Sequence, residues 1–291
     1  MIPRTNIPDL SGSKSSEGAS LVDQSIPRAA ETGHVGLLIV NADDWGQDVL
    51  TTNKILECSA QGAVSSVSGM VFMEDSERAA TLATERGIET GLHLNFVTPF
   101  SASSCPAGLL EHQQRLARYL MRRRLAQVIF HPGLMHSFEY VVAAQFDEFH
   151  RLYGADPEKV DGHYHMHLCA NVLLQRLIKP GTIVRRNFSF ESGEKSMWNR
   201  LYRKLVDRSL ARRHRITDCF FSLPPLEPLS RLQRIYSLAR KSVVELETHP
   251  VNAEEYRYLA GGEIFRQAGD VRIGRPSSLS WRARSGEKNR L

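Results

Sequence analysis

Three histidines stand at every second position in the segment 161–167, which reads Asp-Gly-His-Tyr-His-Met-His. If this segment is extended, His163, His165 and His167 point to one face, because side chains alternate along a strand. Neutral imidazole is the commonest metal ligand in proteins. The spacing therefore predicts a metal site, and the structured pattern on both sides argues against a His-rich loop.

Two adjacent carboxylates, Asp43 and Asp44, follow the apolar run 35–41 directly. Carboxylates that leave a buried run are costly unless they are paired or bound. If the chain turns at this point, one could bind a cation while the other acts as a base. The alternative is that one of them caps the following helix, and the motif alone does not decide between the two.

Two further histidines follow apolar segments. His93 lies in Gly-Leu-His-Leu-Asn (91–95), and His249 lies in Glu-Leu-Glu-Thr-His-Pro (245–250). Each alone is typical of a core or surface histidine. Taken with the two motifs above, an Asp and two His with open positions for water indicate a catalytic divalent-metal site of hydrolase type. The unmatched carboxylate and histidine would then serve as base and acid.

The cysteines do not support a structural zinc site. They stand far apart and form no Cys-x-x-Cys pair, at Cys58, Cys105, Cys169 and Cys219. We expect buried, reduced thiols in a cytoplasmic protein. No apolar stretch approaches the roughly 20 residues of a membrane helix, and residues 1–20 lack the apolar centre of a secretory signal.

The elements that must position these residues alternate between strand and helix. The pattern predicts strands at 35–41, 63–71, 88–95, 159–163, 182–186, 216–221 and 242–248, and helices at 48–61, 76–86, 111–130, 135–153 and 171–178. This alternation indicates an α/β fold, a barrel or barrel-like sheet. The candidate residues follow strands, whose carboxyl ends converge on one face in such folds.

The two ends of the chain lack this periodicity. We expect a disordered N-terminal arm at 1–34, a single catalytic domain at 35–275, and a flexible basic tail at 276–291. The net charge of +5 is concentrated in arginine clusters at 122–124, 208–215 and 282–290. Solvated helix faces are the favoured interpretation, and anionic lipid or phosphate contact is the alternative. No nucleic-acid-binding signature is present.

These motifs resemble the YdjC/ChbG-like carbohydrate deacetylase family. Its pattern is matched in order at Asn41–Gly46, Gly91–His93, Asp161–His167 and Glu245–Pro250, and Gly62–Ser66 is similar to a further family segment. The resemblance implies a distorted (β/α) barrel of the carbohydrate-deacetylase and glycoside-hydrolase type. It also implies a metal-dependent hydrolase of linear amides that removes the acetyl group from N-acetylated amino sugars, with magnesium or zinc as the metal.

The resemblance also implies roles for single residues. Asp44, His93 and His163 match the metal ligands, Asp43 the general base, and His249 a general acid that protonates the leaving amine. The other matched positions would support the ligands or contact substrate, and they are His165, His167, Glu245 and one of Arg185 and Arg186.

Three departures from the family pattern bear on the substrate. Trp45 replaces Phe, Glu247 stands where an apolar residue is more common, and the loop 97–108 is short and rich in Ser. The expected partner is an acetylated amino sugar or glycolipid, since some relatives act on chitin-derived oligosaccharides and others are associated with hopanoid lipids. Peripheral membrane contact through the arginine clusters and a homodimer stay open.

Two other functions compete with deacetylation. One is a catalytically inactive relative that binds sugar or lipid. The other is a metal-free glycoside hydrolase that uses Asp43 and Glu245 as its carboxylate pair, although that reaction leaves the histidine motif unexplained.

Overall fold

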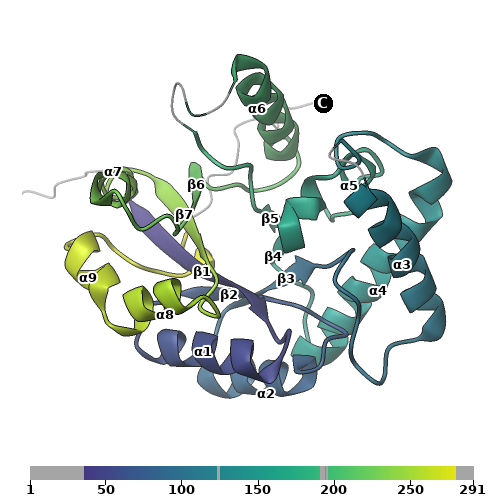
Figure 1. Cartoon of the computed structure of the whole chain (residues 1–291), viewed down its shortest axis with the longest axis horizontal. Helices are drawn as coiled ribbons and strands as arrows, with labels where there is room; N and C mark the ends of the chain where they lie inside the picture. The colour runs from purple at the N-terminus through teal and green to yellow at the C-terminus, as the bar shows by residue number, and fades with distance from the viewer. Residues whose placement is uncertain (1–35, 123–124, 191–193, 195, 280–291) are drawn as a thin grey trace, which may run out of the picture. The chain divides into compact units, whose positions relative to one another are not determined.

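Seven parallel strands form one curled sheet in the computed structural model, which describes residues 36–122, 125–190, 194 and 196–279 (Figure 1). The order across the sheet is β5-β4-β3-β2-β1-β7-β6. The strands are β1 (Leu37–Trp45), β2 (Ser66–Gly69), β3 (Thr90–Leu94), β4 (Lys159–Gly162), β5 (Ile183–Val184), β6 (Cys219–Ser222) and β7 (Val243–Thr248). Backbone hydrogen bonding from Ser189 to Phe220 links the chain beyond β5 to β6, so the prediction of a distorted barrel is confirmed.

The helices lie outside the curled sheet. They are α1 (Val49–Ala60), α2 (Ser76–Arg86), α3 (Ala107–Arg122), α4 (Met135–Tyr153), α5 (Ala170–Leu174), α6 (Met197–Ala211), α7 (Leu229–Ala239), α8 (Ala253–Ala260) and α9 (Glu263–Ala268). Short 3₁₀ turns are η1 (Pro132–Leu134), η2 (His163–Leu168) and η3 (Pro276–Ser278). Figure 1 shows α1 and α2 together along one side, α3 and α4 beyond β3 and β4, and α7 to α9 around the β1 and β7 side.

The strands carry apolar side chains on their outer face and polar side chains on their inner face, an alternation that was not predicted. In β7, Val244 and Leu246 belong to the apolar core beneath the helices, whereas Glu245 and Glu247 are buried on the other face. The same alternation places polar residues inside the curled sheet along the other strands. The inner-face residues are Asn41, Asp43, Ser66, Ser68, His93, Lys159, Asp161, Glu245 and Glu247.

Local signals fix several helix ends. The Asp48 side chain accepts a hydrogen bond from the Thr51 amide at 2.8 Å and caps α1. Helices α2 and α4 end at Gly87 and Gly154, whose φ angles of 61° and 73° lie in the left-handed region that glycine favours. The predicted helices 76–86 and 135–153 are confirmed to the residue.

Other boundaries differ from the prediction. Helix α3 begins at Ala107, directly after Pro106, rather than at residue 111, because proline is well suited to the start of a helix. The predicted helix to residue 130 is wrong at its end, since residues 125–128 form turns. The strand predicted at 182–186 is only Ile183–Val184, because β5 is an edge strand and Arg185 turns into the sheet interior.

Parts of the predicted termini and basic clusters lie outside the described residues, namely 1–34, 280–291, Arg123 and Arg124. The segment that begins at residue 276 starts with η3, where Pro276 is buried and the Ser277 amide donates to Glu89 at 2.9 Å. Among the described helices, none combines the length and apolarity needed to cross a bilayer. All four cysteines are free; Cys58 and Cys169 are buried, and the other two are half-buried.

Candidate metal centre

A bulge at the end of β1 sets the positions of the paired carboxylates. The register of β1 against β2 shifts between Ala42 and Trp45, and Asp44 has a φ angle of 66°. A bulge re-aims the side chains next to it, so Asp43 and Asp44 each contact the interior from a different angle. Asp48 caps the following helix instead, which decides against the capping alternative for the pair.

Asp44 meets two histidines from neighbouring strand ends. Its Oδ1 lies 3.0 Å from Nδ1 of His163 and 3.4 Å from Nε2 of His93. One ligand atom from each of the three lies within 4.8 Å of the other two. We call Asp44, His93 and His163 the His–Asp cluster.

The far side of the His93 ring is held by a carboxylate. Nδ1 of His93 lies 2.8 Å from Oδ1 of Asp161, and the charges of Arg185 and Lys159 lower the pKa of Asp161 well below its usual value against the effect of burial. An ionised Asp161 keeps a proton on Nδ1, so Nε2 is the ring nitrogen that faces Asp44. A carboxylate behind the ring is the usual support of a metal-bound histidine.

Two atoms of the His–Asp cluster are buried and have no hydrogen-bond partner, Oδ1 of Asp44 and Nε2 of His93. Burial alone would lower the pKa of His93, but the charge of Asp43, the hydrogen bond to Asp161 and the nearby Asp44 carboxylate raise it to about 10. The cluster therefore attracts positive charge to this point. Its donor set, one carboxylate and two imidazoles, fits a divalent cation.

Asp43 faces a different partner, Arg185. The guanidinium makes two parallel bonds to its carboxylate, Nη1 to Oδ2 at 2.6 Å and Nη2 to Oδ1 at 2.7 Å. Burial would raise the pKa of Asp43, but the charge of Arg185 holds it well below its usual range. Arg186 points elsewhere and pairs with Asp207 at 2.8 Å. Of the two arginines that the sequence left open, Arg185 is the one in the interior.

Arg185 and Lys159 tie together the remaining inner carboxylates. Arg185 Nε lies 2.9 Å from Glu245, and Lys159 Nζ lies 3.0 Å from Glu245 and 2.9 Å from Asp161. We call Asp43, Lys159, Asp161, Arg185 and Glu245 the interior charge network. The sequence analysis missed Lys159 and Asp161 as site residues, although the alternating strand Lys159-Val160-Asp161-Gly162 carries the signal.

The prediction that His163, His165 and His167 share one face is wrong. The segment is not extended: it forms η2, with φ angles of 51° at Tyr164 and 56° at His165. A side chain at Gly162 would place its Cβ 3.0 Å from the His167 amide nitrogen, so glycine lets the chain turn back tightly here. The three imidazoles therefore diverge, and only His163 meets Asp44.

The other two histidines of the motif take separate positions. Nε2 of His167 lies 2.9 Å from the Arg185 carbonyl, and the His165 ring packs on Phe188 with 4.6 Å between centroids. Burial lowers the pKa of His167 to about 4 and, together with the charge of Arg185, that of His165 to about 3. Both rings are therefore neutral near pH 7.

The rim of the site carries His249 and Glu247. Nε2 of His249 lies 4.0 Å from Asp44 and 4.0 Å from Glu247, and its amide donates to Glu255 at 2.7 Å. Burial and the charge of Asp43 raise the pKa of Glu247 well above its usual value, which disfavours the ionised form of this carboxyl. Glu255 was not identified from the sequence, since nothing in its helical context marks it.

Two other groups of His and acidic residues come close enough to hold a cation among the described residues, but both are already occupied. In the group Asp43, His93 and Asp161, both acids bind Arg185. In the group Asp43, Glu247 and His249, the first acid binds Arg185, and the raised pKa of the second disfavours its ionised form. Of the three groups, the His–Asp cluster is the one that contains both buried atoms without a hydrogen-bond partner, Asp44 Oδ1 and His93 Nε2.

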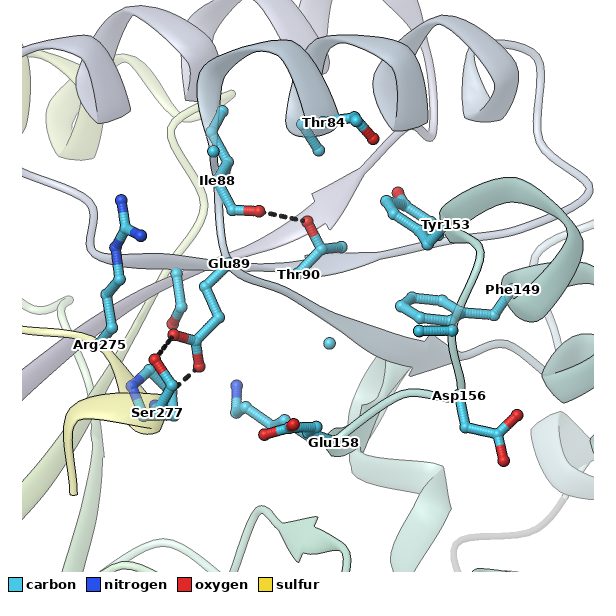
Figure 2. Close-up of a pocket in the computed structure, with 17 residues that line it drawn as sticks. Thr84, Ile88, Glu89, Thr90, Phe149, Tyr153, Asp156, Glu158, Arg275 and Ser277 are labelled. Atoms are coloured by element: carbon cyan, nitrogen blue, oxygen red, sulfur yellow. Dashed lines mark hydrogen bonds between the residues drawn. The ribbon is translucent and has the colours of Figure 1, made fainter. Parts of the chain in front are cut away.

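A cavity of about 430 Å³ lies at the opposite, amino-terminal ends of β2, β3 and β4 (Figure 2). Figure 2 shows Glu89 bonded to Ser277 at its edge, with Thr90, Phe149 and Tyr153 on the other side. It contains no member of the His–Asp cluster. The hydrogen bonds from Ser277 to Glu89 anchor the chain after α9 at this edge of the sheet, so we assign the cavity a structural part and not the chemistry.

Comparison with known proteins identifies a matching family model and similar curated proteins. A family model described as YdjC-like protein matches residues 37–269. A chitooligosaccharide deacetylase of Proteus mirabilis is 31% identical over 132 residues, which are 45% of this chain and 50% of that protein. A mouse carbohydrate deacetylase is 32% identical over 145 residues, 46% of this chain and 44% of that protein. The match spans about half the length of these curated relatives.

A solved structure shares the fold. It is a protein of Enterococcus faecalis V583 named for a proposed cellobiose-phosphate cleavage activity, with a TM-score of 0.57 and 16% identity. The similarity covers 84% of this chain and 98% of that one. At this identity the likeness supports the fold and nothing finer.

Proposed function

The chain belongs to the YdjC-like family, and from that premise we propose that it is a metal-dependent hydrolase that removes the acetyl group from an N-acetylated amino sugar. One observation carries the proposal. A cluster of one carboxylate and two imidazoles, with two buried unpartnered atoms, lies beside a second carboxylate that an arginine holds in place. The relatives named as chitooligosaccharide or carbohydrate deacetylases support the substrate class.

Asp44, His93 and His163 would hold the divalent cation. Such an ion supplies Lewis acidity, which makes water a better nucleophile at neutral pH and polarises an acetyl carbonyl. Two imidazoles and one carboxylate suit zinc, and a carboxylate with water ligands also suits magnesium.

Asp43 would accept the proton of the attacking water. Its depressed pKa keeps it ionised near pH 7, and the two bonds from Arg185 fix its orientation. A carboxylate held in this way is preorganised, so little reorganisation is needed when the proton moves. In this role Arg185 is a positioning residue.

His249 would deliver a proton to the leaving amine. It stands on the rim with its side chain 29% exposed, where a substrate can reach it, and its Nε2 faces Asp44 and Glu247. The hydrogen bond from its amide to Glu255 fixes the backbone at that point.

The remaining predicted site residues would act through others. His167 binds the Arg185 carbonyl and Glu245 binds the Arg185 guanidinium, so both position Arg185. His165 lies on the rim with Phe188 and is placed to contact a sugar ring. Arg186 pairs with Asp207 outside the site, and we assign it no part in the reaction.

The glycoside-hydrolase alternative has less support. It needs two carboxyl groups that flank a sugar. Glu245 is 1% exposed and bound to both Arg185 and Lys159, so it is not placed to touch one.

Acetate release from a panel of chitin-derived oligosaccharides and N-acetylated glycolipids, with and without a chelator, tests the proposal. We expect release that stops on chelation and returns with zinc or magnesium. His163→Ala should lose both bound metal and activity. The control His150→Ala, at an exposed histidine paired with Asp156, should keep both.

Chelator-insensitive release, or full metal content in His163→Ala, would overturn the assignment of the cluster. Metal binding without release from any member of the panel would instead favour the inactive sugar- or lipid-binding alternative.

A further inference from the structure

Helix α6 presents an apolar face to solvent. Five large apolar side chains lie within about 140° of one another around the helix, given its 100° per residue. They are Met197 (72% exposed), Trp198 (74%), Leu201 (44%), Tyr202 (41%) and Leu205 (54%). Contiguous exposed apolar surface of this kind marks an interaction site in soluble proteins.

The opposite face of α6 explains why this side is outermost. Asp207 and Leu210 are the buried residues of the helix. Asp207 accepts hydrogen bonds from Arg186 at 2.8 Å and from Asn187 at 2.9 Å, and Leu210 joins the apolar core. These contacts fix the rotation of the helix, so the apolar face belongs to the folded structure.

The apolar face is accompanied by positive charge. Lys204 and Arg208 are exposed and lie towards one edge of the same face, with Arg200 half-buried beside them. Asp207 is the only acidic residue of α6, and Arg186 already neutralises it. A helix with Trp and Leu on one side and cations along it is typical of helices that lie in the interface of an anionic bilayer.

The direction of α6 brings this face near the candidate site. The helix runs antiparallel to the segment that leaves β5: Asp207 contacts Asn187, and Arg203 lies over the Phe190 ring at 5.1 Å. Met197 and Trp198 therefore lie further along, beyond the carboxyl end of β5, and the His–Asp cluster also lies at the carboxyl ends of its strands. Figure 1 shows α6 beyond β5 and β6, apart from α1 and α2.

We propose that the α6 face, defined as Met197, Trp198, Leu201, Tyr202 and Leu205 with the flanking Lys204 and Arg208, docks on an anionic lipid bilayer. The apolar side chains enter the headgroup boundary, and the two cations meet lipid phosphates. None of the described residues covers this face. The proposal does not depend on the deacetylase reaction, because it concerns where the protein sits and not what it hydrolyses.

Vesicle co-sedimentation of the full chain tests it. The probes are vesicles of phosphatidylcholine alone and of phosphatidylcholine with a quarter phosphatidylglycerol. We expect binding at least tenfold tighter to the anionic vesicles, weakened several-fold by high salt. The double variant Leu201→Ser, Leu205→Ser and the double variant Lys204→Glu, Arg208→Glu should each bind at least tenfold less.

Matched controls are Phe265→Ser, an exposed aromatic of α9, and Lys241→Glu, an exposed cation after α7; both should bind like the unchanged protein. Equal binding to both kinds of vesicle, or unaffected binding by the α6 variants, would overturn the proposal. A third outcome would also overturn it: the unchanged protein does not bind vesicles, and light scattering shows a dimer that the α6 variants dissociate. In that case a second copy of the chain covers the face.

Discussion

The interior charge network and the His–Asp cluster meet at two adjacent residues, yet they differ in what their atoms have left to bind. In the network, every charged group has an opposite charge within 3.0 Å: Asp43 and Glu245 bind Arg185, and Asp161 binds Arg185 and Lys159. In the cluster, Asp44 Oδ1 and His93 Nε2 have no hydrogen-bond partner. Buried polar atoms are rarely left unpaired. The network therefore has a structural role, whereas the cluster has atoms free to bind a ligand.

The largest effect should come from the residue that stands between the two. Asp43→Asn removes the proposed proton acceptor, so we expect kcat to fall by about 10²–10⁴-fold. Metal content, measured on the same preparation, should be unchanged, because Asp43 belongs to the network. Loss of metal as complete as in His163→Ala would move Asp43 into the ligand set and break the comparison.

Next in size is the loss of the network's central cation. Arg185→Met leaves three buried carboxylates without their main partner, and breaking a buried pair in this way costs about 3–5 kcal/mol. Urea unfolding measures it. Arg186→Met is the matched control, since its pair with Asp207 is partly exposed. A similar loss of unfolding free energy in both variants would show that the network contributes no more to stability than this pair does.

A smaller effect is expected at the residue that links the two regions. Asp161→Asn weakens the support behind the His93 ring, and loss of such a partner costs about 10–100-fold in metal affinity. Titration of the metal-free protein with zinc gives the Kd. Asp156→Asn, at an exposed acid, should leave it unchanged. An unaltered Kd in Asp161→Asn would mean that His93 does not bind metal through Nε2.

The smallest effect concerns Glu247, which lies at the edge of both regions. A raised carboxyl pKa gives stability that is present below the unfolded-state pKa and lost as pH rises through the folded-state pKa. Glu247→Gln removes this pH dependence. As pH rises from about 5, the stability of the variant should therefore increase relative to that of the unchanged protein. Near pH 5 we expect a difference below about 1.5 kcal/mol, the size of one neutral hydrogen bond. Parallel melting curves across this range would show instead that Glu247 is ionised in the fold.

Motif residues could be predicted from the sequence because each follows an apolar strand. Asp44, His93 and His163 come from three separate segments, and the parallel sheet brings their strand ends to one edge. Glycines at 87 and 154 likewise marked the ends of α2 and α4. These signals are local, so one sequence is enough to carry them.

The divergence of the three motif histidines could not be predicted in the same way. It depends on left-handed backbone at Tyr164 and His165, a conformation that non-glycine residues adopt only uncommonly. The inner-face partners were hidden for another reason. Lys159 is close to Asn41 and Glu245 only because β4, β1 and β7 curl around one interior. The outward apolar face of α6 also reverses the usual rule for a helix on a domain surface.

The scattered origin of the interior charges has a consequence for the order of assembly. Asp43 and Asp161 lie in the first four strands, whereas Arg185 follows β5 and Glu245 lies in β7. During synthesis, a sheet that stopped after β4 would have Lys159 beside Asp161, but it would have to dehydrate Asp43 before its partner Arg185 had emerged. The early strands should therefore not form a stable sheet until Arg185 is available. Folding of this barrel should be all-or-none rather than progressive, and fragments ending before residue 185 should remain unfolded.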